Sequence, residues 1–535
     1  MPPPSCTLFL LPCLLLFLSP LAAAHDGLVI MANTGCLSHD RLMLHIGRSM
    51  MASPRDPLQQ ITWLQARLFT FGMAHPLGDA QMAGGVGGAG NWTTAIVEAE
   101  TAASRAVASA AQRLFWTRPI PADLQAPWNG LSSVSVFIGG ILEQQIYGQV
   151  AALRSLPFRQ AYNACQPPGL VIVDHVLNDL AIALGGELDA PTVHLSNFPL
   201  LSYAIEFLGV PSPTSYLPII ISSFPNRMSL SERMMNVVGN AGCVGARQVV
   251  DAILSRVLPS EGVPLSRSLP EHRQKVLLMA SPSEPFLDTP RPLSQQVKYL
   301  GCLHCTRTNR SDQVLEDFEI LVSFGSLGSA ELMPEAVAAV VAGALGKLRR
   351  RVLWQTAASP ETNRRLQKLV GPHGRFESWI DFQAHLQSPG LKLLVTHGGL
   401  STCNEAAFHG IPLLGIPLQG DQGYNLQRLA ETGSAELITT KDLNLPNLSF
   451  LLQHMLHNHQ KYAAAATRLR ERMESLHLLE APSTFWLGWT RRWGRRLVDS
   501  AFLRPPFHKL STSLFLHAAL CLAAFSISTL AFLSS

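Results

Sequence analysis

Several residues that could bind a charged ligand lie in one stretch of the chain, residues 395–438. An apolar run ends at Thr396, and His397-Gly398-Gly399 follows as a turn where the backbone can approach an anion closely, because glycine has no side chain. A helical pattern begins near Ser401, and the amide groups and dipole at the start of a helix favour a diphosphate. The stretch therefore predicts an anion site beside His397, Gly399 and Ser401.

Three carboxylate or amide side chains follow in the same stretch. Glu405 lies one turn into the predicted helix, where it could accept hydrogen bonds from two ribose hydroxyls. Asp421 and Gln422 follow the apolar run at 412–418 and combine an acceptor-only side chain with one that also donates. Such a pair suits the hydroxyls of a sugar.

One histidine near the N-terminus is a candidate for proton transfer. His39 follows the apolar run DGLVIMAN (26–33), and a neutral histidine with a pKa near 6.5 can act as a base at neutral pH. A histidine after a strand is more often a satisfied polar residue. Five other histidines are interpreted as structural, namely His45, His75, His175, His194 and His409.

Strand and helix patterns alternate through the chain. LVIVDHV (170–176) is a continuous apolar run ending in an acid, as expected of a central parallel strand, and PTVHLSN (191–197) follows it. The Gly-rich stretch within residues 78–90 follows no clear strand and is interpreted as a flexible loop. The second half predicts strands at 319–326, 350–356, 391–398 and 412–418, and helices at 334–348, 361–369, 403–409 and 422–432.

This alternation predicts an α/β protein with two Rossmann-like domains that face each other across a cleft. The boundary is expected within the polar, Pro-rich residues 285–315, with domains at 25–290 and 291–480. Ligands of such sheets bind at the carboxyl ends of the strands, which is where the loops described above fall.

Hydrophobic segments at both ends of the chain predict that the protein enters the secretory pathway and is attached to its membrane. Residues 1–24 have the pattern of a signal peptide. Residues 513–533 contain no charged side chain and as a helix could cross the ~30 Å hydrocarbon core. Residues 481–512 mix tryptophan with arginine and suit the level of lipid headgroups. A solvated basic helix at 481–512 and a lipid-anchor signal at the C-terminus are alternatives.

Composition and cysteine content narrow the class of protein. Apolar residues make up 47% and charged residues 15% of the 535, which excludes a disordered chain. The net charge of +4 comes without a basic block interleaved with aromatics, so nucleic acid is not expected as a partner. Cys302 and Cys305 form a lone CxxC, for which zinc is not expected, and a local disulfide or two separate thiols remain open.

Residues 395–438 resemble the donor-binding signature of the UDP-glycosyltransferases, the family that contains the UDP-glucuronosyltransferases. The similarity extends over roughly residues 25–533 and is weakest between about 50 and 150. It implies the GT-B type of fold, here with one C-terminal transmembrane helix. The family pattern is met in register by His397 to Gly399, Glu405-Ala406, His409 to Pro412, Gly415 to Leu418, Asp421-Gln422 and Asn425.

The resemblance also implies further donor-binding residues. Ser326 in LVSFGS (321–326) stands in the place of a phosphate-proximal serine, and Trp379 in that of the aromatic that stacks on uracil. Ser401 stands where the family usually has asparagine. The family motif Trp-x-Pro-Gln reads Trp379-Ile-Asp-Phe-Gln383 here, and it stays open whether Gln383 takes the place of the glutamine of the motif. These departures could alter donor preference or weaken activity.

The resemblance finally implies a reaction. His39 would be the general base and Asp174, at the end of LVIVD (170–174), the carboxylate that orients it. Helix amides, Ser326 and His397 would neutralise the departing diphosphate, so neither a metal nor a cofactor beyond the UDP-sugar co-substrate is expected. Attack from the face opposite UDP would invert the anomeric configuration.

The expected function is therefore inverting transfer of a hexosyl or glucuronosyl group from a UDP-sugar to a small lipophilic acceptor. A lipid-directed enzyme, such as a sphingolipid hexosyltransferase, is one alternative. A degenerate protein that binds UDP-sugar or lipophile without turnover is another. The resemblance implies a single-pass protein of the endoplasmic reticulum membrane with lumenal domains, and a homo-oligomer stays open.

Overall fold

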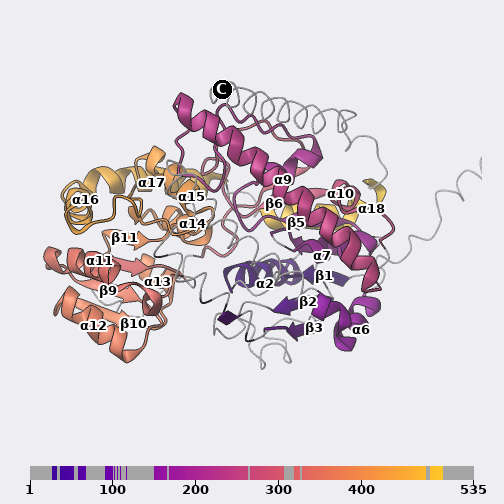
Figure 1. The fold of residues 1–535 in the computed structure, drawn as a ribbon, viewed down its shortest axis with the longest axis horizontal. Helices are drawn as coiled ribbons and strands as arrows, with labels where there is room; N and C mark the ends of the chain where they lie inside the picture. Colours follow the sequence, from indigo (N-terminus) through magenta and orange to yellow (C-terminus); the bar gives the residue numbers. More distant parts are fainter. Residues whose placement is uncertain are drawn as a thin grey trace, which may run out of the picture.

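The structure is a computed structural model in which two parallel sheets are flanked by helices (Figure 1). The predicted α/β class is thereby confirmed. The structure describes residues 27–32, 37–53, 58, 60–67, 91–100, 102, 105–106, 109, 116, 150–165, 168–176, 178–188, 190–262, 265–306, 318–325, 328–476 and 482–497.

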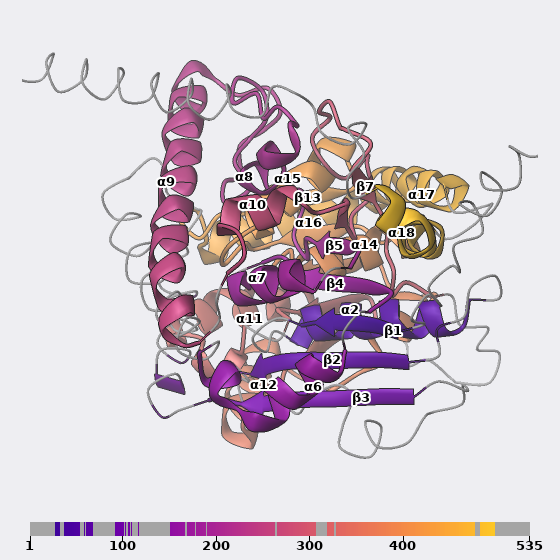
Figure 2. The same cartoon turned by 90° about the vertical axis from the view of Figure 1, so that its right-hand side faces the viewer.

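The first sheet has the strand order β3-β2-β1-β4-β5-β6-β7, with every pair parallel (Figure 2). Its last strand lies beyond residue 290, so this sheet extends into the window in which the sequence placed the domain boundary. The strands are β1 (Gly27–Met31), β2 (Gln60–Arg67), β3 (Asn91–Glu98), β4 (Leu170–Asp174), β5 (Thr192–Leu195), β6 (Leu278–Ser281) and β7 (Val297–Tyr299).

The second sheet has the order β10-β9-β8-β11-β12-β13 and is also parallel throughout. The strands are β8 (Ile320–Ser323), β9 (Val352–Gln355), β10 (Gly374–Glu377), β11 (Leu393–Thr396), β12 (Leu413–Gly415) and β13 (Ala435–Leu437).

Helices lie in most of the described connections between consecutive strands, as is usual for parallel pairing, and β6 and β7 are joined without one. Those of the first part of the chain are α2 (Leu37–Met51), α6 (Leu156–Ala164), α7 (Asp179–Glu187), α8 (Ser202–Ile205), α9 (Leu230–Ser260) and α10 (Leu269–Gln274). Those of the second part are α11 (Glu335–Leu348), α12 (Pro360–Val370), α13 (Phe382–Leu386), α14 (Leu400–His409), α15 (Gln422–Thr432), α16 (Leu445–His457) and α17 (His459–Leu476).

The central strands form where apolar residues run without interruption. All five residues of β4 and all four of β8 and β11 are buried, as expected for strands covered on both faces. Strand β8 is shorter than the predicted 319–326, because the chain turns at Gly325 with a φ of 66°. Helix α14 begins at Leu400, earlier than the predicted 403, because Gly399 serves as its N-cap.

The last described helix, α18 (Pro482–Leu497), returns to the first sheet (Figure 2). It contacts α2 and β5, and Leu487 is buried in the same core as β1. The ammonium of Lys298 lies 4.1 Å from the ring centroid of Trp486. Trp489 and Trp493 on the same helix are exposed. One face of the segment that we assigned to lipid headgroups therefore packs on protein.

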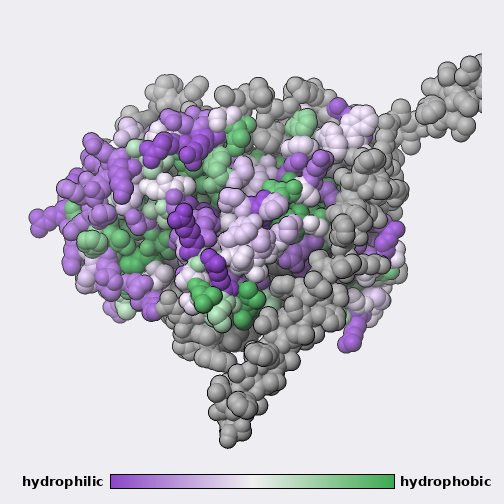
Figure 3. Space-filling model, turned by 90° about the horizontal axis from the view of Figure 1, so that it is seen from above, coloured by the Kyte–Doolittle hydropathy of each residue, from purple (hydrophilic) through white to green (hydrophobic). Residues whose placement is uncertain are grey.

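None of the helices that the structure describes is long and apolar enough to span a membrane. The predicted signal peptide (1–24) and transmembrane helix (513–533) lie outside the described residues. Viewed from above, the described surface mixes hydrophilic and hydrophobic patches (Figure 3).

Candidate functional site

His39 and Asp174 are brought together by the parallel pairing of β1 and β4. His39 lies in the first turn of α2, which follows β1, and Asp174 is the last residue of β4. The carboxyl ends of these neighbouring strands meet at one edge of the sheet. His39 Nδ1 lies 2.7 Å from Asp174 Oδ2. The two residues predicted as base and orienting carboxylate therefore form a buried hydrogen-bonded pair.

Asn197 holds the carboxylate of Asp174 in place. Its Nδ2 donates to Asp174 Oδ2 over 2.8 Å, and the amide of Val176 donates to Oδ1 over 3.2 Å. Sequence reasoning missed Asn197, although it closes the run PTVHLSN. Because β5 is the neighbour of β4, a polar residue just after β5 has to lie beside Asp174.

The pKa of His39 is set by opposing effects. Burial lowers this pKa, but the charge and hydrogen bond of Asp174, with the charges of Asp40 and Asp421, raise it overall above 6.5. An ionised carboxylate only accepts hydrogen bonds, so Nδ1 carries the hydrogen and Nε2 is left to take a proton. Asp421 follows β12 of the second sheet, so residues of both domains act on His39.

The turn at His397 has the predicted form. It follows β11, Gly398 has a φ of 89°, and Gly399 caps α14, so the first amides of this helix start beside His397. Burial lowers the pKa of His397 to about 4, so its ring is neutral at neutral pH. A Cβ on Gly399 would lie 2.8 Å from His397 Nε2, which explains why glycine fits there. Ser401 lies half-buried in the first turn.

Asp421 and Gln422 lie at the start of α15. Asp421 accepts a 2.8 Å hydrogen bond from Asn425 Nδ2, and burial raises the pKa of Asp421 to about 6. Gln422 Oε1 accepts from the amides of Leu418 and Gln419 at 2.8 and 2.9 Å. The amide oxygen of Gln422 is thus bonded to the backbone, and its NH₂ group is the part that could reach a ligand.

Gln383 bonds to the loop that follows β7. Its Oε1 accepts from the amide of Thr306 over 2.7 Å, and its Nε2 donates to the carbonyl of His304 over 2.5 Å. Both ends of the side chain are therefore engaged with the backbone of this loop.

The same loop contains the CxxC and contacts Glu405. Cys302 and Cys305 form a disulfide, the local pairing that the sequence had left open. His304 Nε2 lies 3.3 Å from Glu405 Oε1. The sulfur and nitrogen atoms of Cys302, His304 and Cys305 cluster within 4.8 Å, but both sulfurs are consumed by the disulfide.

Trp379 presents its ring at the surface, with 58% of the residue exposed. The guanidinium carbon of Arg41, on α2, lies 4.3 Å from the ring centroid. No feature of the sequence pointed to this contact. Ser326 lies outside the described residues.

Most of the histidines that we interpreted as structural are described, and two of them face each other. The Nδ1 atoms of His175 and His194 lie 3.2 Å apart in the core. Burial lowers the pKa of both rings, that of His194 to about 3, so this pair is neutral at physiological pH. His75 lies outside the described residues.

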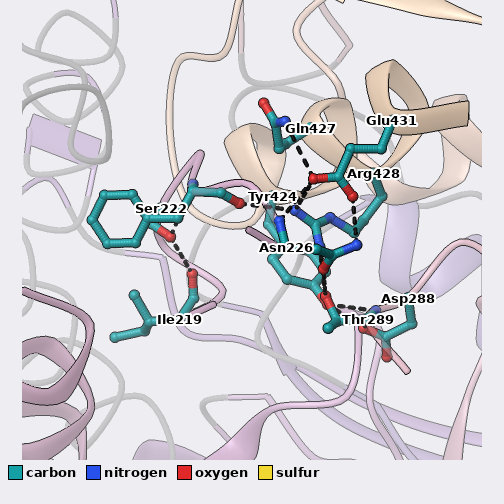
Figure 4. A network of polar contacts seen from close by, with 10 residues as sticks. Ile219, Ser222, Asn226, Asp288, Thr289, Tyr424, Gln427, Arg428 and Glu431 are labelled. Carbon is teal, nitrogen blue, oxygen red and sulfur yellow. Dashed lines mark hydrogen bonds and ion pairs between the residues drawn. The ribbon is translucent and has the colours of Figure 1, made fainter. Parts of the chain in front are cut away.

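A polar network joins α15 to the first half of the chain (Figure 4). Arg428 donates to Asn226 Oδ1, and to Thr289 Oγ1 over 2.7 Å. Tyr424, one turn earlier, hydrogen-bonds to Asp288. Because α15 starts at Asp421 and Gln422, this network ties the helix that carries them to the chain around the first sheet.

Comparisons with known proteins identify a family for the chain. Residues 170–493 match the model of the family described as UDP-glucoronosyl and UDP-glucosyl transferase. UDP-glucuronosyltransferase 2B15 of Rattus norvegicus is 31% identical over 307 residues, which is 53% of this chain and 55% of the relative. UDP-glucuronosyltransferase 2C1 of Oryctolagus cuniculus is 27% identical over 303 residues, 52% and 56% of the two chains. The chain thus spans about half the length of the curated relatives that it matches.

Solved structures share the fold at low identity. A UDP-glucosyltransferase from Polygonum tinctorium gives a TM-score of 0.56 at 14% identity, covering 89% of this chain and 99% of the other. The glycosyltransferase VinC gives 0.53 at 15% identity, covering 88% and 100%. These likenesses support the GT-B fold. Because the family match covers more than half of the chain, the protein belongs to the UDP-glucoronosyl and UDP-glucosyl transferase family.

Proposed function

We propose that the protein is an inverting glycosyltransferase that moves a hexosyl or glucuronosyl group from a UDP-sugar to a small lipophilic acceptor. The observation that carries this proposal is the 2.7 Å contact between His39 Nδ1 and Asp174 Oδ2. The charge of Asp421, from the second domain, also raises the pKa of His39. A base and a ligand-binding carboxylate from opposite domains are what transfer between two bound substrates requires.

His39 would act as the general base. With Nδ1–H donated to Asp174, Nε2 removes the proton from the acceptor hydroxyl, and the oxygen attacks the anomeric carbon. The bond from that carbon to the diphosphate oxygen breaks, and its electron pair leaves with UDP. Attack opposite the leaving group inverts the anomeric centre. Asp174 stabilises the imidazolium that forms, as in other base and orienter pairs.

The second domain would bind the donor. The first amides of α14, beside His397, Gly399 and Ser401, suit the diphosphate and stabilise the charge that develops on it. The exposed ring of Trp379 suits stacking on uracil, and Glu405 suits the ribose hydroxyls. Asp421 and the NH₂ group of Gln422 would contact the sugar. Gln383 would act indirectly, because its side chain holds the loop that contains His304.

The predicted location and the remaining donor contact belong to the proposal as well. A lipophilic acceptor fits a chain with a charge-free segment at 513–533 that would anchor lumenal domains to the endoplasmic reticulum membrane. Ser326 would complete the diphosphate site.

A transfer assay read by mass spectrometry tests the proposal. Membranes with the wild-type chain, His39→Gln or His457→Gln are offered several UDP-sugars with phenols, steroids and ceramides. His457 is an exposed histidine on α16 and serves as the matched control. We expect a conjugate from the wild type and the control, and a rate about 10²–10⁴-fold lower in His39→Gln, because a general base contributes about that factor.

Two outcomes would count against the proposal. An unchanged rate in His39→Gln would remove His39 as the base. UDP-sugar binding without any product from the wild type would favour the non-enzymatic alternative. Conjugation of ceramides but not of phenols or steroids would select the lipid-directed enzyme.

A further inference from the structure

One cation of the first domain reaches the residues assigned to the donor. Arg41 follows His39 by two positions on α2, and its guanidinium carbon lies 4.3 Å from the ring centroid of Trp379. His45, one turn further along α2, lies with its ring centroid 6.2 Å from that of His304, in the loop that contacts Gln383 and Glu405. Residues four apart share a helix face, so this face of α2 is turned toward the donor-side loops.

The guanidinium also interacts with Glu405. Burial lowers the pKa of Arg41, and the charge of Glu405 acts in the opposite direction. Arg41 thus contacts an aromatic ring that suits uracil and is acted on by the charge of a carboxylate that suits ribose. It occupies part of the region where the nucleoside would bind.

The proposed diphosphate position lies on the same face of α14 as Glu405, whose charge acts on Arg41. Ser401 and Glu405 are four residues apart on this helix, about 6 Å along the axis. A UDP-sugar brings a diphosphate to a region that already contains the carboxylates of Glu405 and Asp421. Buried charges of one sign need a cation or hydrogen-bond donors nearby.

We propose that Arg41 is a donor-binding residue supplied by the first domain, whose guanidinium leaves the ring of Trp379 to uracil and pairs with the diphosphate. This inference rests on the proposed function. The exchange is favourable because stacking of a base on an aromatic ring stabilises more than an exposed cation–π contact does. A guanidinium is suited to bidentate hydrogen bonds with phosphate oxygens. Donor binding would thereby draw α2, and His39 with it, onto the donor.

Calorimetric titration of the purified full chain with UDP and with uridine tests this role without turnover. We expect Arg41→Gln to weaken UDP binding about ten- to hundredfold, the loss of charge-assisted hydrogen bonds, and to change uridine binding less than about twofold. Arg41→Lys should recover part of the loss because it keeps the charge but not the planar fork. Arg256→Gln removes an exposed arginine on α9 and should leave both affinities unchanged.

The contrary results are distinct from one another. Equal weakening of UDP and uridine in Arg41→Gln would show that Arg41 only shapes the stacking surface. Tighter UDP binding in this variant would show that Arg41 merely blocks the site. Either result overturns the inference and leaves the donor site standing. Failure of the wild-type chain to bind UDP would instead overturn the proposed function and this inference with it. Unchanged thermal melting of the variants confirms that they fold.

Discussion

At the scale of single residues, the environment of His39 allows a buried imidazole to take up a proton. Desolvation favours the neutral ring, and Asp174 at 2.7 Å favours the cation, with the second effect prevailing when Asp40 and Asp421 are included. Asp40 is itself buried, and desolvation raises its pKa to about 7. A raised pKa makes the imidazole a stronger base for the proton of an acceptor hydroxyl.

The pH dependence of transfer follows from this balance. Only neutral His39 can take a proton, so kcat/KM should fall as the pH drops through its raised pKa, with a midpoint above 6.5. Asp174→Asn removes the charge that favours the imidazolium, so the midpoint should move to lower pH, and the maximal rate should fall by about a hundredfold or more. Initial rates across pH 5 to 9, taken at saturating donor and at acceptor concentrations well below KM, give the midpoint of kcat/KM, and saturating acceptor gives the maximal rate. A midpoint that stays in place in Asp174→Asn would assign it to another group.

At the scale of elements, the predicted site residues that the structure describes lie at the carboxyl ends of parallel strands or in the loops and helices that follow these ends. The signature at 395–438 was readable because strand, turn and helix are contiguous there. His39 and Asp174 are 135 residues apart in the sequence. Only the family resemblance predicted that they lie together, because no local pattern connects them.

Other features could not have been predicted from the sequence, for identifiable physical reasons. The contact of Arg41 with Trp379 joins different domains and has no local pattern. The side chain of Gln383 forms hydrogen bonds with the backbone of the loop at 302–306, and hydrophobic periodicity in the sequence cannot predict such contacts. The sequence pattern of an amphipathic helix is the same whether its apolar face contacts lipid or protein. The packing of α18 on the first sheet could therefore not be predicted from the sequence.

The turn between β11 and α14 should tolerate no side chain at Gly398. Its φ of 89° disfavours other residues by about 1–2 kcal/mol, and a Cβ would overlap Leu426, which adds about 1–3 kcal/mol of overpacking. We therefore expect Gly398→Ala to lower the free energy of unfolding by about 2–5 kcal/mol. Urea denaturation followed by circular dichroism measures this change.

Gly262→Ala is the matched control for Gly398→Ala. Gly262 has a φ of 80°, but nothing lies within 4 Å of its added Cβ, so the loss should be about 1–2 kcal/mol from the backbone alone. Equal losses in the two variants would show that Leu426 moves aside and that close packing does not fix this turn.

At the scale of the whole molecule, the arrangement of the two domains matters because the proposed base and donor site lie on different sheets. Besides the contact of Arg41 with Trp379, two larger sets of contacts join the domains in the described part of the chain. Helix α18 follows the second sheet in the chain and packs on the first, and the network around Arg428 joins α15 to the residues near Asn226 and Thr289. At the same interface, a Cβ on Gly423 would overlap Ser223, so the backbones approach closely there.

Removal of Arg428 should separate catalysis from donor binding. Arg428 is 4% exposed, and Arg428→Met leaves the carbonyl of Phe224 and the side chain of Asn226 without this partner. Unfolding should become about 2–6 kcal/mol easier, because each buried acceptor that loses its donor costs about 1–3 kcal/mol. Asp421 and Gln422 remain attached to the second sheet, so the Kd for UDP should change less than about threefold, whereas kcat should fall about tenfold as His39 loses its alignment. Arg468→Met, at an exposed arginine of α17, should change none of these quantities. Urea denaturation, UDP titration and initial rates measure them. If UDP affinity fell in parallel with kcat, the network would instead support α15 locally, and the relative position of the domains would not depend on Arg428.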